Sequence, residues 1–148
     1  MTDVQPIPDG YTAVTPYLVA EDAAGLIDFL TNAFGAVERM RMPMPDGSIA
    51  HAEVEIGGAA VMLGSAMPPE FPPTQAQIHL YVEDVDGVYA QAVTAGATAV
   101  TEPEDQFYGE RIGRVVDPAG NVWSIATHVE DVTPEQMMER MAAMMDEG

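Results

Sequence analysis

The chain has 148 residues, enough for one compact domain or for two small modules that share a core. It carries 24 acidic residues against five basic ones, and its formal net charge is −19 at pH 7. Such a charge repels phosphate backbones and anionic membranes, so we expect neither a nucleic-acid nor a membrane partner. It attracts cationic small molecules, although acidity can also serve solubility alone.

Two residue types are missing from the chain. Without cysteine it has no disulfide, thiolate nucleophile or cysteine-ligated metal, and without lysine it has no Schiff-base chemistry. The segment MTDVQPIPDGYTAV lacks the basic region and apolar run of a signal peptide, and no later segment reaches the ~18 apolar residues of a membrane span. We therefore expect a soluble, cytoplasmic protein.

Residues 11–66 read as a βαβββ module. The segment TPYLV is a predicted strand, and Asp22 is the predicted N-cap of a helix that ends at Gly35. Three further strands, AVERMRM, IAHAEVEI and AAVMLG, are separated by turns that contain glycine.

Residues 76–128 repeat the same order of elements. The strand QIHLYV leads to a helix that begins near Asp84, and the strands TAVTEP, RIGRVV and NVWSIAT follow. A shift of 62 residues aligns Asp22 with Asp84, so the chain is predicted to contain an internal repeat within one domain. Residues 67–75, which are rich in proline, are expected to form an extended linker.

The tail is predicted to form a helix over residues 133–146. It opens with a capping box of Thr133 and Gln136, and methionines recur at helical spacing after it. We expect this methionine stripe to pack against the domain or a partner subunit. The alternative is an adaptable cover over a ligand pocket.

The tandem βαβββ modules, with VEDVDGVYAQAVTAGA opening the second and DPAGNVW closing it, resemble the glyoxalase/bleomycin-resistance/extradiol-dioxygenase superfamily, also called vicinal oxygen chelate proteins. The segments TPYLVAEDAAGLIDFLTNAFGA, HAEVEIGG and WSIATHVEDVTPEQM resemble its PhnB-like branch. The resemblance implies an α+β fold in which the modules curl into a half-open mixed sheet with a cavity, with the C-terminal helix added. It also implies a homodimer that completes the cavity.

Metal enzymes of that family carry His, Gln or Glu ligands on the first and last strand of each module. The resemblance places these positions at Thr15, Gln77, Met62 or Leu63, and Ser124. Gln77 is the one plausible ligand among them. This departure from the family pattern puts metal-dependent isomerisation and dioxygenation in doubt.

Strand alternation points to a different set of polar residues. It places His51 and Glu53 on one face of their strand, and Gln77 and His79 on one face of theirs. If both faces line the concave side of the sheet, these four side chains could converge on a divalent metal. They could equally form the wet face of an antiparallel sheet, or give a histidine that acts as an acid, a base or a ligand contact without metal. His128, at the end of its strand, is a weaker candidate.

Four more residues complete the candidate ligand pocket. Tyr17 lies on the first strand, Ser124 lies in a last-strand position, and Tyr108 could stack on an aromatic ligand. Arg111 could bind a ligand carboxylate or phosphonate, or could form a salt bridge in an acidic protein. Trp123 is expected to pack beneath a helix.

The sequence leaves three functions open and assigns no catalytic residue. The first is a metal-dependent lyase, isomerase or dioxygenase that uses His51, Glu53 and His79. The second is a binding protein without chemistry that sequesters a cationic or aromatic compound, as bleomycin-resistance relatives do. The third is an interaction module whose contact surface is the methionine-rich tail.

Overall fold

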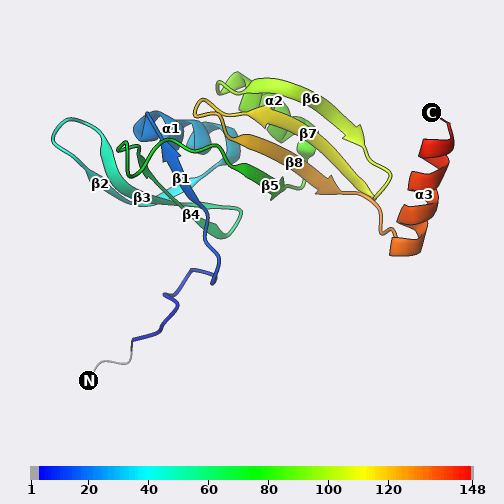
Figure 1. Cartoon of the computed structure of the whole chain (residues 1–148), viewed down its shortest axis with the longest axis horizontal. Coiled ribbons are helices and arrows are strands. Elements are labelled where there is room, and N and C mark those ends of the chain that lie inside the picture. The colour runs from blue at the N-terminus through cyan, green and yellow to red at the C-terminus, as the bar shows by residue number, and fades with distance from the viewer. Residues whose placement is uncertain (1–3, 148) are drawn as a thin grey trace.

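The computed structural model describes residues 4–147, which form two consecutive βαβββ modules and a C-terminal helix (Figure 1). The first module contains β1 (Tyr17–Ala20), α1 (Ala23–Phe34), β2 (Val37–Pro43), β3 (Ile49–Ile56) and β4 (Ala59–Ser65). The second contains β5 (Gln77–Tyr81), α2 (Val85–Thr94), β6 (Thr98–Asp105), β7 (Glu110–Val116) and β8 (Val122–His128), and α3 (Pro134–Asp146) follows. The predicted α+β fold is confirmed.

Each module builds an open four-stranded mixed sheet with the same strand order. The first sheet runs β1-β4-β3-β2 and the second β5-β8-β7-β6. In both, the first strand pairs in parallel with the last, and the other pairings are antiparallel. The repeat found in the sequence is therefore a repeat of topology.

The two module helices begin in the same way. The carboxylate of Asp22 accepts the backbone N–H of Gly25 at 2.9 Å, and that of Asp84 accepts the N–H of Gly87 at 3.1 Å. Each side chain satisfies an N–H that the first turn of a helix leaves free. The predicted N-caps are confirmed, and α1 ends at Gly35 in the left-handed conformation, with φ 67°.

One hydrophobic core joins the modules. Helices α1 and α2 lie on the same side of the two sheets and pack against each other (Figure 1). Trp123 of β8 is buried in this layer, with its ring centroid 4.7 Å from that of Phe34 of α1. The prediction that Trp123 packs beneath a helix is confirmed. The opposite faces of both sheets are free of helices.

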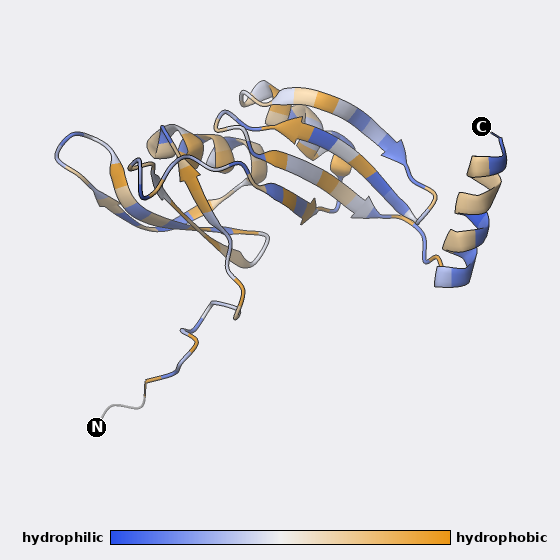
Figure 2. Cartoon of the chain, viewed as in Figure 1, coloured by the Kyte–Doolittle hydropathy of each residue, from blue (hydrophilic) through white to orange (hydrophobic). Residues whose placement is uncertain are grey.

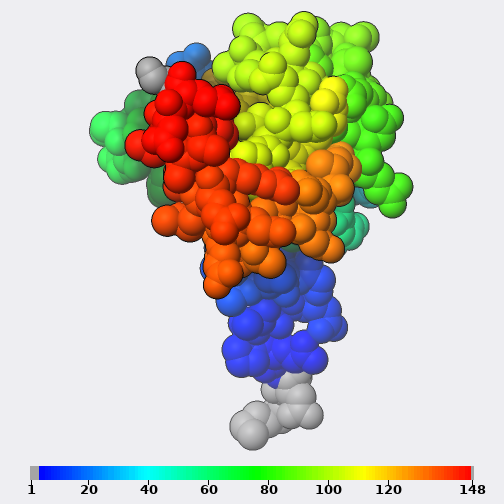
Figure 3. All heavy atoms as spheres, turned by 90° about the vertical axis from the view of Figure 1, so that its right-hand side faces the viewer, coloured from blue at the N-terminus to red at the C-terminus, as the bar shows by residue number. Residues whose placement is uncertain are grey.

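Helix α3 stands apart from the sheets at one end of the molecule (Figures 1 and 3). It buries none of its residues, and its apolar side carries four exposed methionines (Figure 2): Met138, Met141, Met144 and Met145. Arg140 attaches α3 to the body by hydrogen bonds to the carbonyl oxygen of Phe107 at 2.9 Å and to the Glu130 carboxylate at 2.8 and 2.9 Å. Apart from Met137, which lines a cavity with residues of the second module, the methionines of the stripe do not pack against the domain. A partner subunit for it stays a prediction.

The segment between the modules is less extended than expected. Met67 and Phe71 pair through two backbone hydrogen bonds of 2.6 and 2.9 Å, which fold residues 67–71 into a tight turn directly after β4. The chain then runs extended into β5. Within residues 4–147, no helix has both the length and the apolar character needed to cross a bilayer.

Candidate functional site

The helix-free face of the first sheet carries a chain of three polar side chains. His51 and Glu53 lie two residues apart on β3, so they point to the same face, and Tyr17 reaches them from β1 across β4. His51 Nε2 lies 2.8 Å from Glu53 Oε2, and His51 Nδ1 lies 3.2 Å from the Tyr17 hydroxyl. Glu53 is only 9% exposed, so its carboxylate depends on this contact. The prediction that His51 and Glu53 share a face is confirmed.

The helix-free face of the second sheet carries a related group in a different order. The Glu110 carboxylate accepts the hydroxyl proton of Tyr81 and lies 3.5 Å from His79 Nε2. The rings of His79 and Tyr81 lie 4.8 Å apart, centroid to centroid. Here the carboxylate is central, whereas in the first sheet the imidazole is central. The hydrogen bond to Glu110 raises the pKa of Tyr81 above its ordinary value.

The four residues considered as metal ligands remain in separate groups. His51 contacts Glu53 on the first sheet, while His79 contacts Glu110 on the second. Within residues 4–147, no three His, Asp or Glu side chains come close enough together to hold a metal ion. Zinc centres and the facial-triad iron centres of proteins use three or more protein ligands held by the fold. The donor set of the described residues does not fit such a centre.

A cavity of about 420 Å³ opens at the end of the second sheet, where the chain turns into α3. It is lined by Tyr108, Glu110, His128, Asp131, Val132, Thr133 and Met137. Glu110 and His128 are direct neighbours across β7 and β8, and His128 Nε2 lies 2.8 Å from Asp131 Oδ1. His128 also lines an adjoining cavity with Tyr81 and Glu83. The His79–Tyr81–Glu110 group therefore borders this hollow.

The remaining candidates lie on both sides of the second sheet. Ser124 pairs with His79 in the parallel register of β5 and β8, and its hydroxyl accepts a hydrogen bond from Nε of Arg114 at 3.2 Å. Gln77 is exposed at the start of β5. Arg111 lies on the side that α2 covers, with two 3.0 Å hydrogen bonds to the Asp86 carboxylate. Arg111 thus forms the salt bridge that the sequence left as an alternative.

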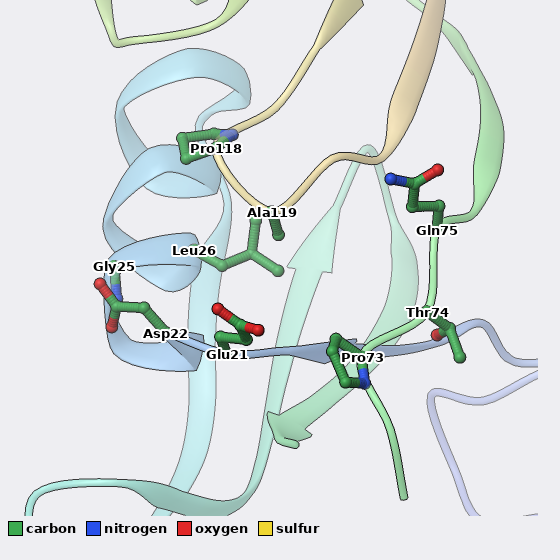
Figure 4. Close-up of a pocket in the computed structure, with 9 residues that line it drawn as sticks. All are labelled: Glu21, Asp22, Gly25, Leu26, Pro73, Thr74, Gln75, Pro118 and Ala119. Atoms are coloured by element: carbon green, nitrogen blue, oxygen red, sulfur yellow. The ribbon is translucent and has the colours of Figure 1, made fainter. Parts of the chain in front are cut away.

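The junction of the modules holds a different cavity, of about 520 Å³, between the start of α1, the linker and the turn before β8 (Figure 4). Glu21 and Gln75 point into it, while the carboxylate of Asp22 is turned toward Gly25 as the helix cap (Figure 4). No histidine, tyrosine or arginine lines this cavity. We therefore place the candidate site on the helix-free faces of the sheets.

Sequence reasoning missed Glu110, the central residue of the second group. The sequence pattern predicts this strand to begin at Arg111, one residue after the start of β7, so it leaves Glu110 outside the strand. The alternation of β7 puts Glu110 on the same face as Arg114 and opposite His128, a signal that the sequence contains. Asp131, which follows β8, has no such periodic signal.

Comparison with known proteins agrees with the fold of two consecutive βαβββ modules. The model of the glyoxalase/bleomycin resistance protein/dioxygenase superfamily matches residues 10–125. The chain belongs to this superfamily. It is also 42% identical over 144 residues to uncharacterized proteins of Mycobacterium bovis and Mycobacterium tuberculosis H37Rv, covering 90% of this chain and 95% and 85% of those proteins.

Solved structures of superfamily-like proteins share the fold. TioX from Micromonospora sp. ML1 is 28% identical, with a TM-score of 0.69 over 80% of this chain and 99% of that protein. A gene product from Arabidopsis thaliana is 25% identical, with a TM-score of 0.65 over 78% and 98%. A Burkholderia phytofirmans family enzyme, 19% identical with a TM-score of 0.63 over 76% and 95%, is similar in fold alone.

Proposed function

We propose that this superfamily member binds a small organic cation, such as an aromatic ammonium compound, in the cavity at the end of the second sheet and does not transform it. One observation carries the proposal. The lining of the cavity of about 420 Å³ combines two acidic residues, Glu110 and Asp131, with Tyr108, His128 and Met137, and no arginine lines it.

This lining suits a cation physically. Carboxylates and the negative faces of aromatic rings both attract an ammonium group, and a cavity of this size is within the range that holds small ligands. A formal net charge of −19 raises the local concentration of cations around the protein. Because Met137 is unbranched and flexible, it can adapt to ligands of different shape.

The neighbouring residues hold Glu110 in place. Tyr81 donates its hydroxyl proton to one carboxylate oxygen, and His79 approaches the other at 3.5 Å. A carboxylate fixed from both sides loses little side-chain entropy when a ligand arrives. His79 is therefore a positioning residue in this proposal, in place of the metal-ligand role that the sequence suggested.

Calorimetric titration tests the proposal, with benzyltrimethylammonium as a compact cation and bleomycin as a larger one. We expect heat for benzyltrimethylammonium and an affinity roughly tenfold lower in Glu110→Gln, the loss of about 1.4 kcal/mol expected for one partly exposed charge contact. Asp28→Asn is the matched control, because it removes one charge from an exposed position on α1. Absence of heat at high micromolar concentration, or an equal loss in both variants, would contradict the proposal.

A metal-dependent lyase, isomerase or dioxygenase is the alternative function that the sequence raised. It would need at least three protein ligands around one ion. The described residues of one chain offer only separate pairs. The described residues of one chain therefore support the binding site better than a metal centre.

We also propose that two copies of the chain associate through the methionine side of α3, in the cytoplasm. Four exposed methionines, on a helix that packs against no other helix or strand, give an apolar surface without a partner among residues 4–147. Superfamily members are often dimeric, and a cysteine-free chain suits a reducing compartment.

A further inference from the structure

A smaller cavity, of about 280 Å³, lies on the first module, away from the proposed cation site. Its lining is almost wholly apolar and consists of Tyr17, Val19, Ala50, Ser65, Met67 and Phe71. It carries no formal charge, although the chain as a whole is strongly acidic. The cavity therefore selects for a neutral ligand, because an ion placed there would lose hydration without gaining a partner.

The turn after β4 forms one wall of this cavity. Met67 and Phe71 are joined by two backbone hydrogen bonds, and their side chains are 54% and 58% exposed. Large apolar side chains on a short, self-paired turn can fold over a bound molecule at little cost to the rest of the structure. A ligand under the turn would shield apolar surface that now faces water.

At the Tyr17 end of the cavity, the donors and acceptors of the hydrogen bonds among Tyr17, His51 and Glu53 can be assigned. The Glu53 carboxylate is an acceptor, so His51 must carry its proton on Nε2, which lies 2.8 Å away. In the neutral imidazole Nδ1 is then an acceptor, and the Tyr17 hydroxyl 3.2 Å away donates to it. With this neutral tautomer of His51, the Tyr17 proton is engaged by Nδ1 and the Tyr17 oxygen offers its lone pairs as an acceptor.

Gly64 provides the space that this hydroxyl occupies. A Cβ added at position 64 would lie 3.0 Å from the Tyr17 oxygen and 3.0 Å from the carbonyl oxygen of Ala50. A larger residue would displace the phenol from His51 or push the backbone of β3. The glycine therefore leaves room for the Tyr17 hydroxyl. The second hydroxyl of the lining, that of Ser65, accepts the backbone N–H of Ile49 at 2.9 Å.

From these observations we infer that the cavity binds a compact, neutral, mainly apolar molecule with one hydroxyl group, such as a simple phenol. The ring lies against Val19, Met67 and Phe71, and its O–H donates to the Tyr17 oxygen. Tyr17, His51 and Glu53 thus act together as a hydrogen-bond acceptor for a ligand hydroxyl. This site is independent of the cation site on the second sheet.

Fluorine NMR titration with 4-fluorophenol and 4-fluoroanisole tests this inference, because replacing O–H by O–CH₃ removes the single donor and keeps the fluorinated ring. We expect the wild type to bind the phenol roughly fivefold tighter than the anisole, the difference that one net hydrogen bond makes. Tyr17→Phe should remove this preference and still bind the anisole, which shows that the cavity is intact. Gly64→Ala should weaken binding of the phenol more than that of the anisole.

Tyr81→Phe is the matched control, because it removes the corresponding phenol on the second sheet. It should leave the preference for 4-fluorophenol unchanged. Equal binding of the two probes by the wild type, a preference that survives Tyr17→Phe, or no binding of either probe would overturn the inference. None of these results depends on whether benzyltrimethylammonium binds at the cation site.

Discussion

The indole N–H of Trp123 donates a hydrogen bond to Oδ2 of Asp117 at 2.9 Å, in the interior of the protein. The same oxygen accepts from Nδ2 of Asn121, and Oδ1 accepts the backbone N–H groups of Ala119 and Asn121, each at 2.9 Å. Asp117 is only 4% exposed, so these four donors replace its hydration. This carboxylate fixes the turn that leads into β8.

Asp117→Ala should therefore lower the free energy of unfolding by about 3 kcal/mol or more, because it leaves the indole and amide donors unpaired in the core. Urea denaturation measures the change. Asp28→Ala, at an exposed position of α1, should change it by less than about 0.5 kcal/mol. A loss below about 1 kcal/mol for Asp117→Ala would contradict the assigned role.

The hydrogen bond between Tyr81 and Glu110 gives a pH dependence. Because the pKa of Tyr81 is raised, folding favours the protonated phenol. This contribution to stability is complete below the ordinary tyrosine pKa of about 10 and disappears as the pH rises through the higher folded-state value. Ultraviolet titration of the wild type and Tyr81→Phe should show Tyr81 ionising late. In Glu110→Gln its pKa should fall toward the ordinary value.

Arg111 should be dispensable for ligand binding. It lies on the side of the second sheet that α2 covers and contacts Asp86 and Asp105, both largely exposed. The guanidinium also lowers the pKa of Asp86. Arg111→Met should cost no more than about 1 kcal/mol in urea denaturation, as exposed ion pairs contribute little. A tenfold weaker affinity for benzyltrimethylammonium in Arg111→Met would show that this reading of the site is wrong.

Removal of α3 separates folding from binding and assembly. A chain that ends at Thr133 should unfold at nearly the same temperature as the full chain, because α3 buries no residue. It should bind benzyltrimethylammonium more weakly, since Met137 is lost from the cavity. If α3 joins two copies, light scattering should show that the truncated protein has about half the molar mass in solution that the full-length protein has. An unchanged mass would remove α3 from the interface.

Divalent metals should have no specific effect on the protein. The described donors form pairs. We therefore expect Zn²⁺ or Mn²⁺ to shift the melting temperature of the wild type no more than that of His79→Ala under the same conditions. The protein must be prepared without a histidine tag. Stoichiometric metal that survives dialysis, and is lost in His79→Ala, would restore the metal-dependent function.

The fold was predictable because its signals are local. Helix caps, turn glycines and the alternation of strands are set by neighbouring residues, and the repeat supplied the same signals twice. The shared face of His51 and Glu53 was predictable for the same reason, because side chains two residues apart on a strand point to the same side of the sheet. Nothing comparable fixes contacts between distant strands.

The contact of His79 with Glu110 joins residues 31 positions apart, so it depends on strand order and register that the sequence pattern does not contain. The side of Arg111 was predictable in principle. It shares the alternation of Val115, which is buried under α2. For α3, periodicity defined an apolar side but could not say what faces it.

The two sheets place a phenol, an imidazole and a carboxylate on corresponding faces but connect them in different orders. With the imidazole between its partners, the first sheet has a phenol oxygen at the end of the group. With the carboxylate between its partners, the second sheet has the acidic side chain in the middle of the group. The middle member comes from the equivalent strand in both modules, β3 or β7. A duplicated scaffold can thus acquire two selectivities without new residue types, by changing which residue type that strand places in the middle.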